Sequence, residues 1–285
     1  MDMADKFNIF EENISYLTER SKILNEQKTI TFELIAQRLS ESKADLQDEI
    51  NTQYVILSDA SPSDCIAFFS ILCQNNISLP QLLAEHDEPY DVFCREATSK
   101  ISYVKNNYND IAFLRFSELF AKPTVSYGTT FEEVCKDVYN SESDFCILPI
   151  ECSANGKMFS FYSLINKYEL KIFAVCDIDE GISEKRTRYA LLSRKTLIYP
   201  GDTQLEYFEF SIVGSEEYQL CDILEAAKSS SVSVYRIDTL PVSYDDLKFR
   251  FHHVFEGNKK DLLPFIMYLN YKYPQYEIVG NYILI

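Results

Sequence analysis

The sequence predicts an α/β protein with a helical N-terminal region, and three observations support this fold class. Apolar residues recur at three- and four-residue spacing through the first fifty residues, which is typical of amphipathic helices. From Lys100 on, short apolar runs alternate with helical patterns, as in a mostly parallel sheet joined by helical crossovers. The last third follows the order strand, helix, strand, strand, helix, strand. We therefore expect three domains, at residues 1–95, 100–196 and 204–285.

The helical region is predicted from two apolar series and one helix start. The first series is Phe7, Phe10, Ile14, Leu17 and Leu24, and the second is Phe32, Ile35, Leu39, Leu46 and Ile50. Further on, Ser61 is a candidate N-cap and Pro62 occupies the first helical position, before the apolar run that ends at Cys73.

The remaining elements are predicted by apolar runs of strand length and by helical spacing between them. In the middle segment we expect strands at 101–104, 124–128 and 144–150, and helices at 111–120 and 131–140. In the last segment we expect strands at 207–213, 231–237, 247–255 and 276–285, and helices at 216–228 and 259–271.

Charge and composition exclude several classes of function. The chain has 44 acidic and 27 basic side chains, a formal net charge of -17, so its field repels nucleic acid and anionic membranes. The longest apolar run is too short to cross a bilayer, and the sequence begins without a basic, apolar signal. We therefore expect a cytoplasmic protein. The eight cysteines are scattered without a CxxC pair and the chain has only three histidines, so we expect no metal site. The sequence contains no nucleotide-binding motif, so we expect no cofactor.

Three motifs in the middle segment carry a family resemblance. They are TTFEEVCKDV at 129–138, LPIECSANG at 148–156, and RTRYALLSR at 186–194. In these blocks the chain resembles the prephenate dehydratase family, which converts prephenate to phenylpyruvate in L-phenylalanine biosynthesis. The resemblance implies a lyase and a periplasmic-binding-protein-like α/β lobe. It covers about 100 residues.

The resemblance implies roles for individual residues. Prephenate carries two carboxylates and a ring hydroxyl, so decarboxylation with loss of the hydroxyl needs cations that orient the anion and a hydrogen-bond donor at the departing oxygen. Thr187 is implied as that donor and Arg188 as the clamp for a carboxylate. The residues implied to line the substrate cleft are Glu151, Cys152, Ser153 and Tyr189.

Two departures from the family pattern leave alternatives open. The family's glycine-rich turn is replaced by KNNYNDI at 105–111, and only 36 positions separate Glu151 from Thr187, about half the usual number. Either most of one lobe is missing, or LPIECS is the equivalent strand of the second lobe. The chain is therefore either an active dehydratase or a non-catalytic relative that binds an aromatic ligand or a partner enzyme.

The last segment resembles an ACT domain, a ferredoxin-like regulatory module that follows the dehydratase in this family and binds an amino acid, often at a dimer interface. In VYRIDTLPV the family's Glu, Ser, Arg and Pro correspond to Asp238, Thr239, Leu240 and Pro241. The glycine at the family's helix start is replaced by residues 215–218. The missing arginine and glycine argue against phenylalanine feedback, whereas the fold predicts a homodimer.

The N-terminal helices are weakly similar to the chorismate mutase domain that some bacteria fuse ahead of prephenate dehydratase. That reaction needs a cage of cations, for which the candidates here are Arg20, Lys22, Lys28 and Arg38. The alternative is that these charges form the solvated face of an amphipathic helix. A bifunctional enzyme is thus the third hypothesis.

Overall fold

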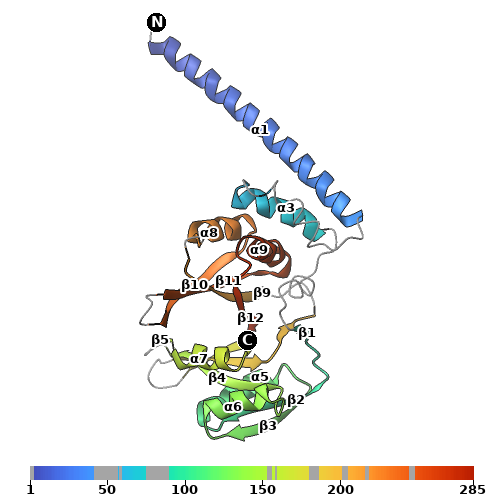
Figure 1. Cartoon of the computed structure of the whole chain (residues 1–285), viewed down its shortest axis with the longest axis vertical. Coiled ribbons are helices and arrows are strands. Elements are labelled where there is room, and N and C mark those ends of the chain that lie inside the picture. The colour runs from blue at the N-terminus through green and yellow to red at the C-terminus, as the bar shows by residue number, and fades with distance from the viewer. Residues whose placement is uncertain are drawn as a thin grey trace. The chain divides into compact units, whose positions relative to one another are not determined.

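The computed structural model describes the chain except for residues 1–2, 42–56, 58–59, 75–89, 153–155, 158, 180–185, 201–204, 216–217 and 244–247. The predicted site residue Ser153 and part of the second apolar series lie outside the described residues. The chain divides into two compact units, Met1–Ile77 and Ser78–Ile285 (Figure 1). Each unit is described by itself.

The described part of the first unit is helical, as predicted. Its long helix is α1 (Met3–Glu41), and α3 (Pro62–Gln74) begins where Ser61 Oγ accepts a hydrogen bond from the backbone N–H of Asp64, 3.2 Å away. Phe32 of α1 packs edge-on against Phe68 of α3. No helix in the described ranges combines the length and apolarity needed to cross a bilayer.

The second unit begins with an α/β segment whose helices start at recognisable caps. Asn106 accepts a hydrogen bond from the N–H of Asn109 at the start of α5, and Thr130 accepts one from Glu133 at the start of α6. The elements are β1 (Tyr90–Val92), β2 (Thr98–Val104), α5 (Asn107–Ser117), β3 (Lys122–Gly128), α6 (Phe131–Tyr139), β4 (Phe145–Cys152), β5 (Gly156–Lys157), α7 (Phe159–Lys167), β6 (Lys171–Asp179), β7 (Arg186–Ser193) and β8 (Thr196–Ile198). Strand β1 lies inside the range predicted as helical.

The C-terminal segment has the predicted βαββαβ order. Its elements are β9 (Leu205–Val213), α8 (Leu220–Ser229), β10 (Ser233–Ser243), β11 (Lys248–Asn258), α9 (Lys259–Lys272) and β12 (Glu277–Leu284). The strands lie side by side as β10, β11, β9, β12, all antiparallel to their neighbours. This is the strand order of a ferredoxin-like sheet, so the fold class is confirmed.

The two segments share one ten-stranded sheet, with the order β10-β11-β9-β12-β6-β7-β4-β2-β3 and β5 beside β4. Strand β12 pairs in parallel with β6, and this pair joins the segments. Gly280 permits the close approach, because a Cβ there would lie 2.5 Å from the carbonyl oxygen of Ile172. The predicted boundary at 196–204 therefore falls between strands of one sheet.

The sheet is mixed, whereas the sequence predicted a mostly parallel one. Strands β2, β3 and β4 are parallel because α5 and α6 serve as crossovers. Only six residues, 180–185, connect β6 to β7, and a parallel crossover needs a dozen or more. Strands β6 and β7 are accordingly antiparallel, and so are β7 and β4.

Two hydrophobic cores cover the two faces of the α/β segment. Side chains of α6 and α7, among them Val134 and Phe161, pack on one face, which continues onto β9, β11 and β12. Side chains of α5, among them Phe116, pack on the other face with Tyr199. Successive residues of β7 therefore point alternately into one core and into the other.

Candidate functional site

Strand β7 positions the threonine motif at the centre of the sheet, between β4 and β6. Arg188 lies opposite Glu151 of β4 and Asp177 of β6, and Thr187 lies opposite Cys152 and Ile178. Directly opposed residues of antiparallel strands project to the same face. The register thus places one arginine between two carboxylates.

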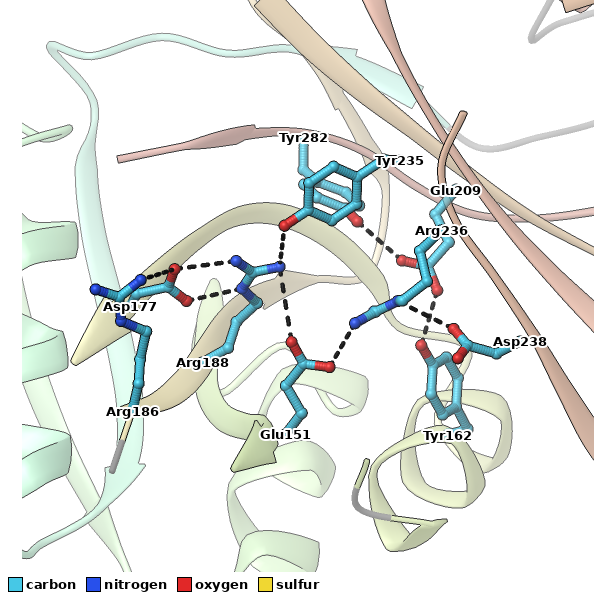
Figure 2. Close-up of polar contacts among 10 residues, drawn as sticks. All are labelled: Glu151, Tyr162, Asp177, Arg186, Arg188, Glu209, Tyr235, Arg236, Asp238 and Tyr282. Carbon is cyan, nitrogen blue, oxygen red and sulfur yellow. Dashed lines mark hydrogen bonds and ion pairs between the residues drawn. The ribbon is translucent and has the colours of Figure 1, made fainter. Parts of the chain in front are cut away.

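Arg188 is held by its neighbours on that face (Figure 2). Its Nε and Nη2 donate to the two carboxylate oxygens of Asp177 at 2.7 and 3.0 Å, a bidentate pair. Its Nη1 donates to the hydroxyl of Tyr235 at 2.7 Å and lies 3.7 Å from Glu151 Oε1. Hydrogen bonding to Asp177 raises the pKa of Arg188 above its usual range, although burial opposes this. Its side chain is 15% exposed.

A second arginine reaches the same carboxylate from β10. Arg236 Nη1 donates to Glu151 Oε2, and its Nε lies 3.0 Å from Asp238 Oδ2 (Figure 2). Burial lowers the pKa of Arg236, but the charges of Glu151 and Asp238 outweigh it and raise that pKa overall. We call Glu151, Asp177, Arg188, Arg236 and Asp238 the arginine–carboxylate cluster.

The cluster adjoins a buried acid. Glu209 of β9 is 1% exposed and accepts hydrogen bonds from Tyr162 Oη at 2.9 Å and Tyr282 Oη at 3.0 Å (Figure 2). Its Oε1 also lies 3.8 Å from His252 Nδ1. Burial, together with this carboxylate, raises the pKa values of both tyrosines. Tyr162 comes from α7, so the acid ties the α/β segment to the C-terminal strands.

The two implied catalytic residues, Thr187 and Arg188, lie on opposite faces of the sheet. Thr187 is 4% exposed and points to the same face as Tyr189, two positions along the strand, which lies in the α5 core. Arg188 points to the same face as Ala190, which lies in the core formed with α6 and α7. Because successive side chains of a strand point to opposite faces, Thr187 and Arg188 do not converge on one point. Their catalytic roles remain predictions.

The other predicted residues are distributed around the cluster. Glu151 belongs to it, and Cys152 is buried beside Thr187. Asp238 also belongs to it, whereas Thr239 and Leu240 continue along the edge strand β10. The backbone of Pro241 ends the regular pairing of β10 with β11.

Sequence reasoning missed Asp177, Tyr235 and Arg236. Asp177 precedes the connection to β7 by few residues, so a hairpin with β7 would have placed it near Arg188. Arg236 precedes Asp238 by two positions in VYRIDTLPV, which puts both on one face of a strand. Its contact with Glu151 depends on the curvature of the sheet, because five strands lie between β10 and β4.

Chemically, the cluster pairs two guanidinium groups with three carboxylates. Its formal charge of one negative makes it a poor receptor for a dianion, because like charges repel strongly where water is scarce. In the described ranges, no group of His, Cys, Asp or Glu is arranged to hold a metal ion.

The segment that replaces the glycine-rich turn is also closed by its own side chains. Asn106 Oδ1 accepts from the backbone N–H of Asn109, and Asn109 Nδ2 donates to the carbonyl of Val104 at 2.5 Å. Asn109 is 1% exposed. The N–H of Asn109 is therefore occupied by the cap and is not presented to an anion.

Comparisons with known proteins give one curated relative and several solved structures of similar fold. No family model matches the chain. The bifunctional chorismate mutase/prephenate dehydratase of Buchnera aphidicola (subsp. Acyrthosiphon pisum) is 23% identical over 188 residues, which cover 60% of this chain and 46% of that protein. The chain thus spans less than half the length of this curated relative.

Solved structures share the fold. Prephenate dehydratase from Streptococcus mutans matches with a TM-score of 0.52 and 18% identity, over 65% of this chain and 98% of that one. The prephenate dehydratase of Arthrobacter aurescens in complex with L-Phe matches at 0.50 and 14%, over 65% and 90%. The quorum-quenching acylase GqqA also matches, at 0.52 and 18%, over 64% and 94%, so this fold accompanies more than one activity. By sequence the chain is similar to a bifunctional chorismate mutase/prephenate dehydratase, and by fold it is similar to prephenate dehydratases.

Proposed function

We propose that this chain is a non-catalytic, prephenate dehydratase-like protein that acts by binding. The arginine–carboxylate cluster carries the proposal. Arg188, the residue implied to clamp a substrate carboxylate, is bound by Asp177 along the Nε–Nη2 edge of its guanidinium, and its Nη1 donates to Tyr235. Protein carboxylates thus occupy the position that the reaction would require for the substrate.

A dianionic substrate would have to displace these internal partners. Exchange of one carboxylate for another gains no ion pair, and the displaced carboxylate of Asp177, only 20% exposed, would lose its bidentate partner and keep only Arg186, whose Nη1 lies 3.8 Å away. Glu151 and Asp238 would add repulsion. Electrostatics therefore disfavours prephenate in this cluster.

The length of the chain between the motifs supports the same proposal. Between Glu151 and Thr187 the described elements are β5, α7 and β6, and all of them belong to the one sheet segment and its covering helix. A cleft between two lobes needs a second lobe. Of the two sequence interpretations, this favours loss of most of one lobe.

The ligand class that fits the family is an aromatic-pathway carboxylate or amino acid, and the alternative is a partner enzyme of that pathway. An effector site in the C-terminal segment would differ from the family pattern. Tyr218, at the position of the lost glycine motif, stacks on Phe251 at 4.7 Å and makes a 2.9 Å hydrogen bond with His253 Nε2. A homodimer in the cytoplasm completes the proposal.

The test is phenylpyruvate formation from prephenate by the purified full-length chain, compared with buffer alone. Thr187→Ala and Arg188→Ala are assayed alongside at equal concentration, with Arg186→Ala as a control from the same strand. We expect the wild type to match the buffer. Turnover that is lost in Thr187→Ala and kept in Arg186→Ala would overturn the proposal.

Active dehydratase chemistry is the second candidate, and the sequence relation to the bifunctional enzyme favours it. In this alternative Thr187 and Arg188 act in catalysis, and substrate binding separates Arg188 from Asp177. The same assay decides between the two, because only the active enzyme yields phenylpyruvate.

Mutase activity of the N-terminal helices is the third candidate and rests on the same relative. Of its candidate cations, Lys28 pairs with Asp64 of α3 at 2.5 Å, and Arg20 and Lys22 lie on exposed turns of α1. Consumption of chorismate by the full chain would support it, and chorismate that stays unchanged would exclude it.

A further inference from the structure

A cavity of about 1000 Å³ lies at the opposite ends of the strands from the arginine–carboxylate cluster. Residues that begin β2, β4 and β6, and residues that end β7, line it: Thr98, Phe145, Lys171 and Ser193. The cluster instead uses the end of β4, the end of β6 and the start of β7. This volume is at the upper end for small-molecule sites. We call it the Ser143 cavity.

Ser143 gives the cavity its most specific feature. Ser143 lines the cavity and is 5% exposed, and its buried Oγ has no hydrogen-bond partner among the described residues. A buried hydroxyl without a partner is destabilising. Next to a cavity, the missing hydrogen bond of such a group is supplied by a water or by a bound ligand.

One wall of the cavity is apolar and rigid. Phe93, Phe145 and Leu197 line it. The ring of Phe93 packs on Phe173 at 4.7 Å and on Phe120 at 5.5 Å, so it is fixed by the α5 core. A planar or aliphatic ligand body can bury its surface against this wall.

The rim carries three basic side chains, Lys171, Arg194 and Lys195, and three acidic ones, Asp91, Asp144 and Glu169. Arg194 Nη1 donates to the carbonyl of Tyr139, and its guanidinium lies 4.8 Å from the centre of the Tyr139 ring, so the side chain is held in place. An arginine has five N–H donors, and Arg194 is exposed, with one of its donors bound to Tyr139. Lys171 donates to the carbonyl of Ile278 at 2.7 Å.

The acidic side chains of the rim have other partners or face solvent. Asp91 lies 3.5 Å from Lys195 Nζ, and Asp144 Oδ2 accepts from the backbone N–H of Lys100 at 2.8 Å. Glu169 is exposed. The arrangement therefore favours an anionic group beside Arg194 and Lys171.

We infer that the Ser143 cavity binds a small organic anion, whose apolar body packs on Phe93, Phe145 and Leu197. Its carboxylate, or a similar anionic group, accepts hydrogen bonds from Arg194 and from the hydroxyl of Ser143. The site is separate from the cluster, so the outcome of the dehydratase assay leaves this inference unchanged.

The test is a fluorescence titration of the full chain with 8-anilinonaphthalene-1-sulfonate, which combines aromatic rings with an anionic group. We expect saturable binding that weakens at least fivefold in Arg194→Gln and at least threefold in Ser143→Ala. Arg115→Gln, an exposed arginine of α5 outside the cavity, is the matched control and should bind as the wild type does.

Displacement by small molecules then tests the chemistry. Phenylacetate and octanoate provide an aromatic and an aliphatic carboxylate, and 2-phenylethanol is an uncharged analogue of the first. Displacement of the dye by either acid, but not by the alcohol, supports the inference and identifies the kind of apolar body. Equal binding by wild type, Arg194→Gln and Ser143→Ala, or equal displacement by acid and alcohol, would overturn it.

Discussion

Gly280→Ala tests whether the two segments of the second unit are joined as rigidly as the continuous sheet implies. Gly280 pairs with Ile172 where β12 meets β6, and this is the one strand pair of the described residues that joins the α/β segment to the C-terminal segment. An added Cβ would lie 2.5 Å from the carbonyl oxygen, 2.8 Å from Cβ and 2.9 Å from the nitrogen of Ile172. Two of these three atoms are backbone, so rotation of a side chain cannot relieve the clash.

The expected cost follows from the required shift. The strands must separate by several tenths of an ångström, which strains neighbouring core contacts by about 1–3 kcal/mol and weakens a ladder hydrogen bond worth about 1 kcal/mol. We expect a loss of roughly 3 kcal/mol in the free energy of unfolding. The matched control is Gly257→Ala in β11, where the nearest atoms are side-chain atoms of Val232 and Leu262 at 3.3 and 3.5 Å. Its effect should stay within about 1 kcal/mol in either direction.

Urea unfolding followed by circular dichroism and by tyrosine fluorescence is the suitable assay, because the chain has 20 tyrosines and no tryptophan. Equal midpoints for Gly280→Ala and Gly257→Ala would refute the reasoning, since β12 would then tolerate displacement from β6. A transition of Gly280→Ala that splits into two steps would instead support separate domains at 100–196 and 204–285.

Three further outcomes are expected. Arg188→Ala should cost about 3 kcal/mol in urea unfolding, because the partly buried carboxylate of Asp177 loses its bidentate cation and keeps only Arg186 Nη1 at 3.8 Å. Arg186→Ala, whose side chain is 59% exposed, should cost under about 1 kcal/mol. Burial, aided by the charge of His252, lowers the pKa of His253 to about 4, so the unfolded chain binds a proton more readily between about pH 6.5 and pH 4. The wild type should therefore lose about 3 kcal/mol over that window, relative to its stability above it, and an unchanged pH dependence in His253→Gln would contradict this origin. Tyr162→Phe removes one of two hydroxyls from buried Glu209 and should cost about 2 kcal/mol by thermal unfolding; a loss under about 0.5 kcal/mol would show that the hydrogen bond adds little net stability.

The elements were largely predictable because each has a local signal. The series of apolar spacings located the long helix, and Ser61 with Pro62 located the start of α3. The start of α5 was placed four residues late, at 111 instead of Asn107, although Asn106 is a strong capping residue. Helix α7 was missed because its nine residues follow β4 closely and lack a capping side chain in the sequence.

The sheet was less predictable because its order depends on long-range pairing. Strands β6 and β12 begin at Lys171 and Glu277, and no local pattern specifies that they pair. The short connection at 180–185 was the available signal for an antiparallel β6 and β7. The two-residue alternation of a strand was also sufficient to place Thr187 and Arg188 on opposite faces of the sheet.

The same short connection links the architecture to the proposed loss of catalysis. Six residues between β6 and β7 force a hairpin, and the register of that hairpin sets Asp177 directly opposite Arg188. A chain with a second lobe at this place has room for a substrate beside the arginine, whereas the hairpin supplies a carboxylate of its own. Removal of that carboxylate is therefore the informative change: Asp177→Asn should free Arg188 for an anion while keeping the shape of the side chain. If Asp177→Asn binds prephenate in equilibrium dialysis and the wild type does not, internal neutralisation is what closes the site. If neither binds, the missing half of the cleft is the cause.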